Sequence, residues 1–352
     1  MRREILGMGY VPIAEVRRGS AVESLHFGAV VVADADGAPV AVTGDPDLVT
    51  YPRSSLKPFQ ALPLVESGAA DAFGLTPQFL ALACASHRAE PFQVALVREW
   101  LARLELEPDA LACGPDYPRG SDDRDRLVWG GVPASRVFHN CSGKHSGLLT
   151  YCRHQGIPTA GYEQSDHPAQ AAMREIFTEI AGCGVKADEL GVDGCNLPAP
   201  TFSLRQMAGA LARFASARSS HPGRSDAMAR LLDAMRSHPD HISGRGQPVQ
   251  RLCEATEGRV LAKTGAEGFL AAWLPRDQLG IAIKIADGAP RARFAVLIET
   301  LVQLDLVSAA QAEALDDLRR PAIVNSIGRT VGRIAPCPRC QPVRTILPLT
   351  GS

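Results

Sequence analysis

Ser54 and Lys57 form a Ser-x-x-Lys pair within residues 51–60. Residues three apart lie on the same face of a helix, so this spacing would bring a hydroxyl and an amine together. A serine hydroxyl becomes a nucleophile when a base takes its proton. A lysine can be that base only where burial or nearby cations lower its pKa. The pair therefore predicts a serine nucleophile with a lysine base, although the same spacing also occurs on solvated helix faces.

Two further stretches hold polar residues among small ones. In residues 82–90 a run of small residues ends at Ser86. Small side chains let a backbone or a ligand come close, but the Ser86 hydroxyl could equally bond to the local backbone. Residues 139–147 contain two His, a Cys, a Lys, two Ser and two Gly. We interpret this second stretch as a loop at a functional site, because such a composition suits neither a core helix nor an ordinary strand.

Two cysteines lie in polar, glycine-containing surroundings. Cys141 belongs to residues 139–147, and Cys195 follows a glycine in residues 193–196. Thiolates are strong zinc ligands, so the two cysteines with a nearby His or Lys could hold a metal. Free cysteine is also among the residues most often buried, and the residues alone leave both interpretations open.

Lys263 begins a Lys-Thr-Gly motif on a predicted strand. An early Ser-x-x-Lys and a late Lys-Thr-Gly recur together in class A β-lactamases and penicillin-binding proteins. The Ser-Asp-Asn motif that accompanies them there is missing from this sequence. In that arrangement the second lysine adds positive charge beside the first and would help to keep Lys57 neutral.

Both ends of the chain are predicted to supply strands, while the middle is mostly helical. Apolar and β-branched runs predict strands at residues 12–16, 23–33, 38–43, 259–263, 269–273 and 279–286. Helical apolar spacing predicts helices at residues 78–85, 93–104, 169–181, 202–217, 226–235, 292–306 and 309–318. The expected fold class is α+β, with one antiparallel sheet from about residues 10–50 and 259–287, flanked by helices, and a helical region at about 54–245. We expect a single domain at residues 1–335 and a mobile tail at 336–352.

Composition excludes several classes of function. The 37 Lys and Arg residues balance 38 Asp and Glu residues, and the basic residues are scattered, so nucleic-acid binding is not expected. No apolar run reaches the roughly 20 residues of a membrane span, and the first residues lack a signal-peptide core. The nine cysteines are an odd number without a disulfide-scaffold spacing, which favours the cytoplasm. The C-x-x-C spacing of Cys337 and Cys340 is by itself a weak indication of zinc.

Taken in order, these motifs resemble the L-asparaginase II family, from about residue 10 to residue 335. The resemblance rests on residues 51–58, 84–87, 113–115, 141–145, 193–195, 262–268 and 325–332. It implies a fold similar to that of serine β-lactamases, a homodimer, and hydrolysis of L-asparagine to L-aspartate and ammonia.

The resemblance also implies roles for particular residues. Two Ser–Lys pairs are expected at the active site, and a zinc ion beside them is expected to take two cysteines and a lysine. These residues are Ser54 with Lys57, Ser86 with Lys263, and the zinc ligands Cys141, Lys144 and Cys195. Charge and proximity to the motifs suggest Arg53, His145 and Asp193 for the α-carboxylate and α-ammonium groups of the substrate.

Three alternatives remain open at this stage. The chain could be a glutaminase or another amidase with the same catalytic groups. It could be a β-lactam-recognising serine hydrolase, although the missing secretion signal argues against this. It could also be a non-catalytic protein stabilised by zinc, which would leave the lysines beside the serines without a purpose.

Overall fold

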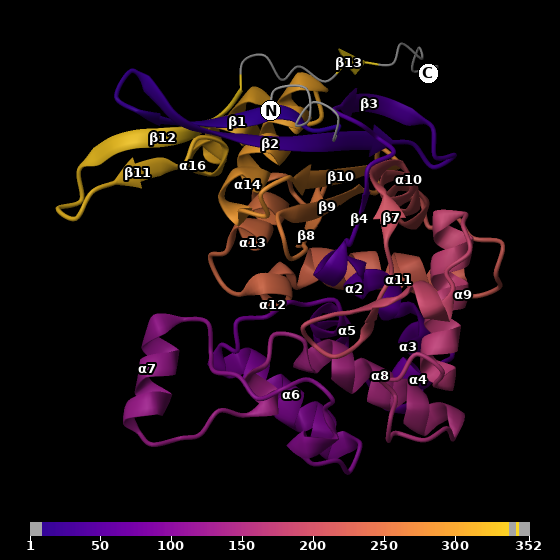
Figure 1. Cartoon of the computed structure of the whole chain (residues 1–352). Helices are drawn as coiled ribbons and strands as arrows, with labels where there is room; N and C mark the ends of the chain where they lie inside the picture. Colours follow the sequence, from indigo (N-terminus) through magenta and orange to yellow (C-terminus); the bar gives the residue numbers. More distant parts are fainter. Residues whose placement is uncertain (1–8, 338–342, 345–352) are drawn as a thin grey trace. The chain divides into compact units, whose positions relative to one another are not determined.

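The computed structural model describes residues 9–337 and 343–344, and the chain forms two compact units. We call the first the sheet unit; its described residues are 9–55, 201–218, 251–337 and 343–344. The second, the helical unit, comprises residues 56–200 and 219–250. Each unit is built from separate stretches of sequence (Figure 1).

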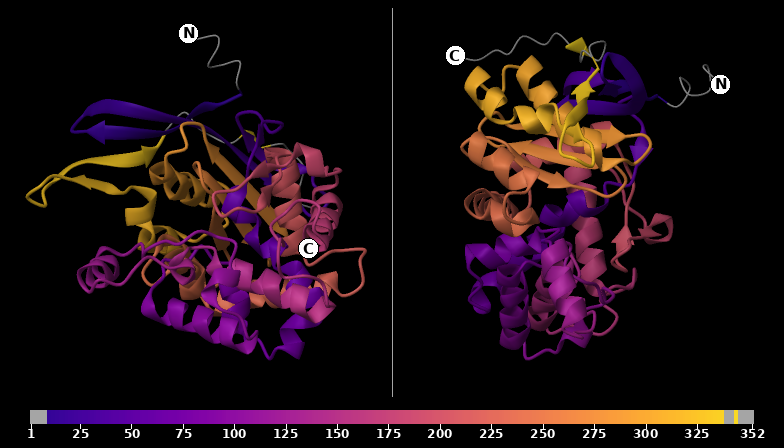
Figure 2. Two further views of the ribbon diagram at one scale, coloured as in Figure 1. Left: turned by 60° about the horizontal axis from the view of Figure 1, so that its bottom comes forward. Right: turned by 90° about the vertical axis from the view of Figure 1, so that its left-hand side faces the viewer.

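The sheet unit is organised around a nine-stranded sheet in which all neighbouring strands pair antiparallel. Seven strands follow the order β11-β12-β1-β2-β10-β9-β8, and β3 pairs with both β2 and β13. The strands are β1 (Val11–Arg18), β2 (Ala21–Ala33), β3 (Pro39–Thr43), β8 (Leu261–Thr264), β9 (Phe269–Leu274), β10 (Leu279–Ile285), β11 (Ala322–Val324), β12 (Thr330–Pro336) and β13 (Val343–Arg344). Figures 1 and 2 show the β1–β2 and β11–β12 hairpins side by side, as the pairing of β1 with β12 requires.

Two helices cover the centre of this sheet. Helix α10 (Leu204–Ala215) packs on β10, β9 and β2, and α14 (Arg293–Gln303) packs on β10, β12 and β1. Strands β9 and β10 are buried along their whole length, which explains why their sequences are apolar apart from Lys284 in β10. A Cβ atom at Gly280 would lie 2.3 Å from the Ala208 carbonyl oxygen, so glycine is what allows α10 to approach β10 so closely.

The predicted α+β arrangement is confirmed, with an antiparallel sheet drawn from both ends of the chain. The sheet also contains β11 and β12, which the sequence analysis did not predict. The helix predicted at residues 202–217 belongs to the sheet unit instead of the helical middle. The helix predicted at 309–318 is divided into α15 (Ala309–Ala314) and α16 (Asp316–Arg319). Of the tail cysteines, Cys337 donates its N–H to the Ile13 carbonyl, whereas Cys340 lies outside the described residues.

The helical unit consists mainly of short helices. They are α2 (Lys57–Gln60), α3 (Leu62–Glu66), α4 (Ala69–Ala72), α5 (Pro77–Ala83), α6 (Pro91–Arg103), α7 (Ser121–Trp129), α8 (Ser142–Gln155), α9 (Pro168–Ala181), α11 (Arg224–Ser237) and α12 (Pro239–Ser243). Helix α13 (Pro248–Ala255) starts in this unit and ends in the sheet unit. Two minor ladders join β5 (Gly191–Val192) to β6 (Pro198–Ala199) and, in the sheet unit, β4 (Val49–Thr50) to β7 (Phe202–Ser203). Within the described residues, every helix is too short or too polar to cross a bilayer.

Helix α8 is the core of the helical unit and corrects one prediction. Ten of its fourteen residues are buried, so the interpretation of residues 139–147 as a loop is wrong from Ser142 onward. The polar side chains find partners inside the helix: Ser146 donates to the Ser142 carbonyl at 2.9 Å and Thr150 to the Ser146 carbonyl at 2.8 Å. Because polar and glycine residues occupy the buried face, the apolar periodicity that predicts a core helix is missing.

Gly143 offers a test of how α8 packs. A Cβ atom there would lie 2.4 Å from the Leu82 carbonyl oxygen of α5, and a backbone carbonyl cannot turn aside as a flexible side chain can. We expect Gly143→Ala to lower the free energy of unfolding by about 1–3 kcal/mol in chemical denaturation. Gly147→Ala is the matched control in the same helix, since its Cβ would meet ordinary contacts of 3.4 Å or more. Equal stability of the two variants would show that α8 does not pack on α5 in this way.

Candidate active site

Lys57 is the first residue of α2, and its side chain is fully buried. Its Nζ donates to the carbonyl oxygens of Ala85 at 2.5 Å and Asn140 at 3.2 Å. The same Nζ lies 3.0 Å from the Ser86 hydroxyl oxygen. A neutral amine has two N–H groups and one lone pair. It can therefore serve both carbonyls and still accept the proton of a hydroxyl.

The surroundings of Lys57 favour that neutral form. Burial lowers the pKa of its ammonium group, and the nearby charge of Lys144 acts in the same direction. The charge of Cys141 opposes them, but the pKa of Lys57 still falls below the usual value for lysine. This is the condition under which a lysine can act as a base near neutral pH.

Ser86 is held in place by the segment that follows α5. Its N–H donates to the Ile242 carbonyl oxygen at 3.0 Å. The three residues before it, Ala83, Cys84 and Ala85, are buried, and larger side chains would leave less room for Lys57 to reach the Ala85 carbonyl. The small residues noted in the sequence thus allow a close approach of a lysine amine.

The three predicted metal ligands are gathered in the helical unit. Cys141 is the N-cap residue of α8, and Lys144 lies one turn further along the helix. Cys195 belongs to the turn between β5 and β6, where its thiol sulfur lies 2.9 Å from the Lys144 Nζ. All three side chains are buried. Nitrogen and sulfur donors of this kind suit zinc, so the residues present fit the predicted ion.

The protonation of these groups is coupled. A hydrogen bond with Cys195 holds the pKa of Cys141 well below its usual value, and the charge of Lys144 adds to this effect. The same hydrogen bond and burial raise the pKa of Cys195. Although burial lowers it, the pKa of Lys144 is raised by the neighbouring cysteines and by Asp193. Zinc binds deprotonated ligands, so the protons that these groups carry would be released when the ion binds.

His145, predicted to bind substrate, lies on α8 beside Lys144. The Tyr162 hydroxyl accepts the Ala112 N–H at 2.8 Å and lies 2.5 Å from the His145 Nδ1. Burial lowers the pKa of His145 and so favours the neutral ring. In the tautomer in which Nδ1 accepts the Tyr162 proton, the ring proton is on Nε2. This Nε2–H is buried and has no hydrogen-bond acceptor among the described residues. It is a donor available to a ligand.

His87 is a neighbouring buried histidine with a structural role. Its Nε2 lies 2.8 Å from the Ser142 hydroxyl, which donates its own proton to the Val137 carbonyl. The His87 Nδ1 accepts the Ala89 N–H at 3.0 Å. Burial lowers the pKa of His87 to about 3, in agreement with a neutral ring that ties the start of α8 to the Ser86 segment.

Ser54 and Lys263 are both found in the sheet unit. Ser54 lies in a 3₁₀ turn (Arg53–Leu56) that leads directly into α2, so Lys57 follows it by one turn of the same segment. Arg53 has a φ of +55°, a left-handed conformation that is unusual for arginine and recurs at functional sites. Lys263 is buried on β8 and donates to the Thr264 carbonyl at 2.9 Å.

The Lys-Thr-Gly motif lies against the segment that carries Ser54. A Cβ atom at Gly265 would lie 2.4 Å from the Pro52 carbonyl oxygen, so only glycine permits this contact within the sheet unit. Arg293 further fixes the motif by donating from Nη1 to the Gly265 carbonyl at 3.1 Å.

The predicted site residues thus form two groups, one in each unit. Ser54, Lys263 and Arg53 belong to the sheet unit, and Lys57, Ser86, Cys141, Lys144, His145, Asp193 and Cys195 belong to the helical unit. The hydrogen-bonded Ser–Lys pair inside one unit is Lys57 with Ser86. The predicted pairings of Ser54 with Lys57 and of Ser86 with Lys263 stay predictions. The sequence analysis missed Tyr162, which orients His145 from 17 residues away and belongs to no motif.

A family model described as L-asparaginase II matches residues 14–336, and the chain belongs to this family. Its activity is accordingly of the asparaginase type, an amide hydrolysis on a small molecule. A search of curated proteins found no match.

Solved structures similar to this chain include a β-lactamase from Mycobacterium bovis, with 15% identity, a TM-score of 0.41 and coverage of 91% of this chain and 100% of that one. A class C β-lactamase from Rhodobacter sphaeroides has 17% identity, a TM-score of 0.35 and coverage of 90% and 95%. At these scores the likeness is distant.

Proposed function

We propose that this protein hydrolyses L-asparagine to L-aspartate and ammonia, with Ser54 as nucleophile and Lys57 as its base. Membership of the L-asparaginase II family supports the reaction. The observation that carries the mechanism is the buried Lys57 amine, whose pKa is lowered and whose hydrogen bonds leave its lone pair available to a hydroxyl.

The first step forms an acyl-enzyme. Lys57 takes the Ser54 proton while the Ser54 oxygen bonds to the side-chain amide carbon, and the carbonyl electron pair moves onto oxygen. Backbone N–H groups at the start of the segment that contains Ser54 and leads into α2 would stabilise this oxyanion by roughly 3–4 kcal/mol per donor. When the carbonyl re-forms, the C–N bond breaks, and Lys57 returns its proton to the nitrogen to release ammonia.

The second step hydrolyses the ester. Water loses a proton to the neutral Lys57, its oxygen adds to the acyl carbon, and the bond to the Ser54 oxygen breaks. The proton then returns to Ser54, and L-aspartate leaves. We assign Ser86 and its predicted partner Lys263 to proton relay and to holding the substrate. For Ser86 this is supported by its hydrogen-bond distance to Lys57.

The substrate's polar groups have candidate partners. His145 offers an Nε2–H without an acceptor, which suits a substrate carboxylate. Arg53 is assigned to the same group by its charge, and the Asp193 carboxylate to the α-ammonium group. Cys141, Lys144 and Cys195 would hold zinc. When bound, the ion would supply a positive charge that polarises or positions the substrate and would tie α8 to the β5–β6 turn.

The direct test is ammonia release by the purified protein, with zinc content measured on the same sample. We expect turnover of L-asparagine with a higher kcat/KM than that of L-glutamine. A higher kcat/KM for glutamine or another amide would be consistent with the proposed mechanism but would show that the proposed substrate is wrong. Hydrolysis of a chromogenic cephalosporin without asparagine turnover, or zinc-dependent folding without any hydrolysis, would overturn the proposal. The homodimer and the cytoplasmic location stay predictions.

A further inference from the structure

We propose that His238, Asp240 and His241 form a second metal site that binds a divalent cation of the zinc class. One ring nitrogen from each histidine and one carboxylate oxygen of Asp240 all lie within 4.8 Å of one another. The three residues lie at the corner between α11 and α12 in the helical unit. They share no residue with the cluster of Cys141, Lys144 and Cys195, and the proposal does not depend on the asparaginase activity.

The backbone holds this corner in shape before any ion binds. His238 ends α11 with its N–H on the Ala234 carbonyl at 3.0 Å, and Pro239 starts α12. The Asp240 carbonyl accepts the Gln93 side-chain amide at 3.1 Å and the Gly244 N–H at 2.8 Å. Ligands that are fixed in advance lose little conformational entropy when a metal binds.

The donor atoms are close to the separation that a metal requires. The Asp240 Oδ1 and the His241 Nδ1 lie 2.8 Å apart. Two ligands bound to zinc at about 2.0–2.1 Å in tetrahedral geometry lie roughly 3.3 Å apart. This pair would therefore have to separate by about half an ångström, and the His238 ring nitrogen lies within 4.8 Å of both atoms. The rings of His238 and His241 meet edge to face with centroids 5.4 Å apart.

An ordinary structural role explains only part of this cluster. His241 packs its ring edge to face on Phe92 at 4.9 Å and bonds to Asp240, which would account for its position. No described residue forms a hydrogen bond with the ring nitrogens of the half-buried His238, which nevertheless lies beside these two side chains. A shared ion gives all three groups a partner.

The donor set selects the class of metal. Two imidazole nitrogens and one carboxylate oxygen suit Zn²⁺, Co²⁺ or Ni²⁺, whereas Ca²⁺ and Mg²⁺ prefer oxygen donors throughout. Three protein ligands leave a position for water or for a ligand atom. The Arg245 Nε lies 4.0 Å from the Asp240 Oδ2, and its positive charge will moderate the affinity.

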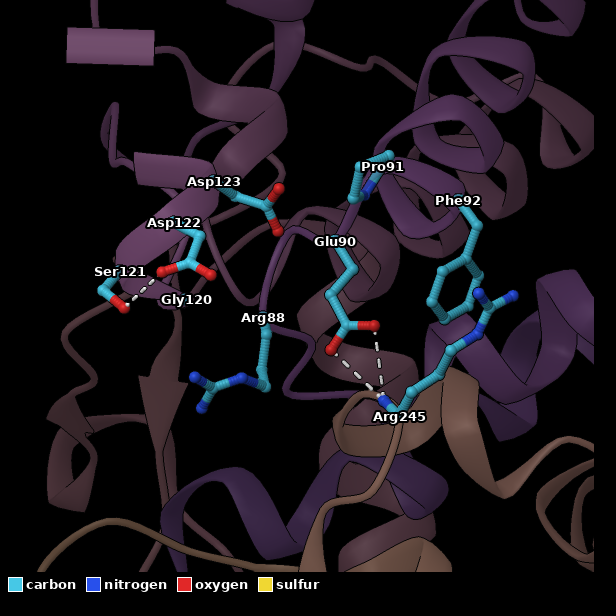
Figure 3. Close-up of a pocket in the computed structure, with 9 residues that line it drawn as sticks. All are labelled: Arg88, Glu90, Pro91, Phe92, Gly120, Ser121, Asp122, Asp123 and Arg245. Atoms are coloured by element: carbon cyan, nitrogen blue, oxygen red, sulfur yellow. Dashed lines mark hydrogen bonds between the residues drawn. The ribbon is translucent and has the colours of Figure 1, made fainter. Parts of the chain in front are cut away.

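Two neighbours of this metal cluster, Phe92 and Arg245, also line a pocket of about 520 Å³ (Figure 3). Phe92 packs on His241, and the Arg245 guanidinium lies over the Phe92 ring at 4.5 Å. The other residues that line the pocket are Arg88, Glu90, Pro91, Gly120, Ser121, Asp122 and Asp123. Phe92 and Arg245 thus contact both the metal cluster and the pocket.

The test counts metal ions on the full-length protein by Co²⁺ and Zn²⁺ titration. Cobalt bound to thiolate shows a charge-transfer band in the near ultraviolet, and cobalt bound to His and Asp does not, so the two clusters can be told apart. We expect the unmodified protein to bind two equivalents. His238→Gln/His241→Gln should bind one and keep the thiolate band, whereas Cys141→Ser/Cys195→Ser should bind one without it.

His154→Gln/His221→Gln is the matched control, because it removes two histidines of the same unit that lie outside the metal cluster. It should bind as much metal as the unmodified protein. Asp240→Asn, which keeps the shape of the side chain, provides the test if the double variant fails to fold. It should weaken binding of the second metal equivalent roughly 10–100-fold. The proposal would be overturned if all cobalt bound by the unmodified protein were bound to thiolate, or if metal binding without the thiolate band survived both the His and the Asp substitutions.

Discussion

Replacing Ser54 with alanine is expected to lower kcat/KM for L-asparagine by at least about 10³-fold, because the acyl-enzyme can no longer form. The fold should be kept, since the Ser54 side chain is half-buried. The turn that contains it (Arg53–Leu56) is held by the neighbouring Ser55, whose hydroxyl donates to the Pro52 carbonyl. Ammonia release under single-turnover and steady-state conditions measures the loss. Thermal unfolding of the same sample shows whether the fold is intact.

Ser55→Ala is the control next to it. The Ser55 hydroxyl is buried and donates to the Pro52 carbonyl at 2.8 Å, so its loss should cost about 1 kcal/mol of stability while activity stays within a few fold. Near-normal activity of Ser54→Ala would remove Ser54 as the nucleophile. If Ser86→Ala were the inactive variant instead, the serine that lies 3.0 Å from Lys57 would take that role.

Replacing Lys57 with methionine is expected to lower kcat by about 10²–10⁴-fold, the range that a positioned general base contributes. Methionine has a similar length and no charge, so it suits a fully buried position, but it leaves the carbonyls of Ala85 and Asn140 without their donor. We therefore also expect a loss of about 1–3 kcal/mol of stability for each carbonyl that stays unpaired.

The pH dependence of kcat/KM distinguishes the loss of the general base from the loss of stability. The neutral amine is the active form of Lys57, so kcat/KM should rise as pH increases through its pKa. Because burial lowers that pKa, kcat/KM should increase at a pH below the usual titration range of lysine. Lys57→Met should lose this rise, and Lys57→Arg should be inactive at every pH because arginine stays protonated.

Lys284→Met provides the control for a lost buried lysine. Lys284 also has a pKa that burial lowers, and it donates to the carbonyls of Glu267 at 2.5 Å and Ile285 at 2.7 Å. This variant should lose stability in a similar way and keep the pH profile. A profile of Lys57→Met that still rises with pH like the unmodified protein would show that another group is the base.

Regular apolar patterns made most of the fold predictable. Strands β9 and β10 and the second half of β2, residues 28–33, are buried on both sides and have largely apolar sequences. Amphipathic spacing located α6, α9 and α14. Strand β11 was missed because it has only three residues. Strand β12 has seven residues but a single buried one, Ile334, so its sequence shows neither alternation nor a buried apolar run.

The sequence alone determined the family, the α+β class and the candidate residues, because each rests on residue types and spacings that lie close together along the chain. Only the tertiary structure decided that α8 is a buried helix, that Lys57 reaches Ser86, and that Tyr162 orients His145. Each of these depends on segments distant in sequence that meet through backbone carbonyls or side-chain protons. Such contacts follow from packing and the satisfaction of buried polar groups, and no local pattern of residues encodes them.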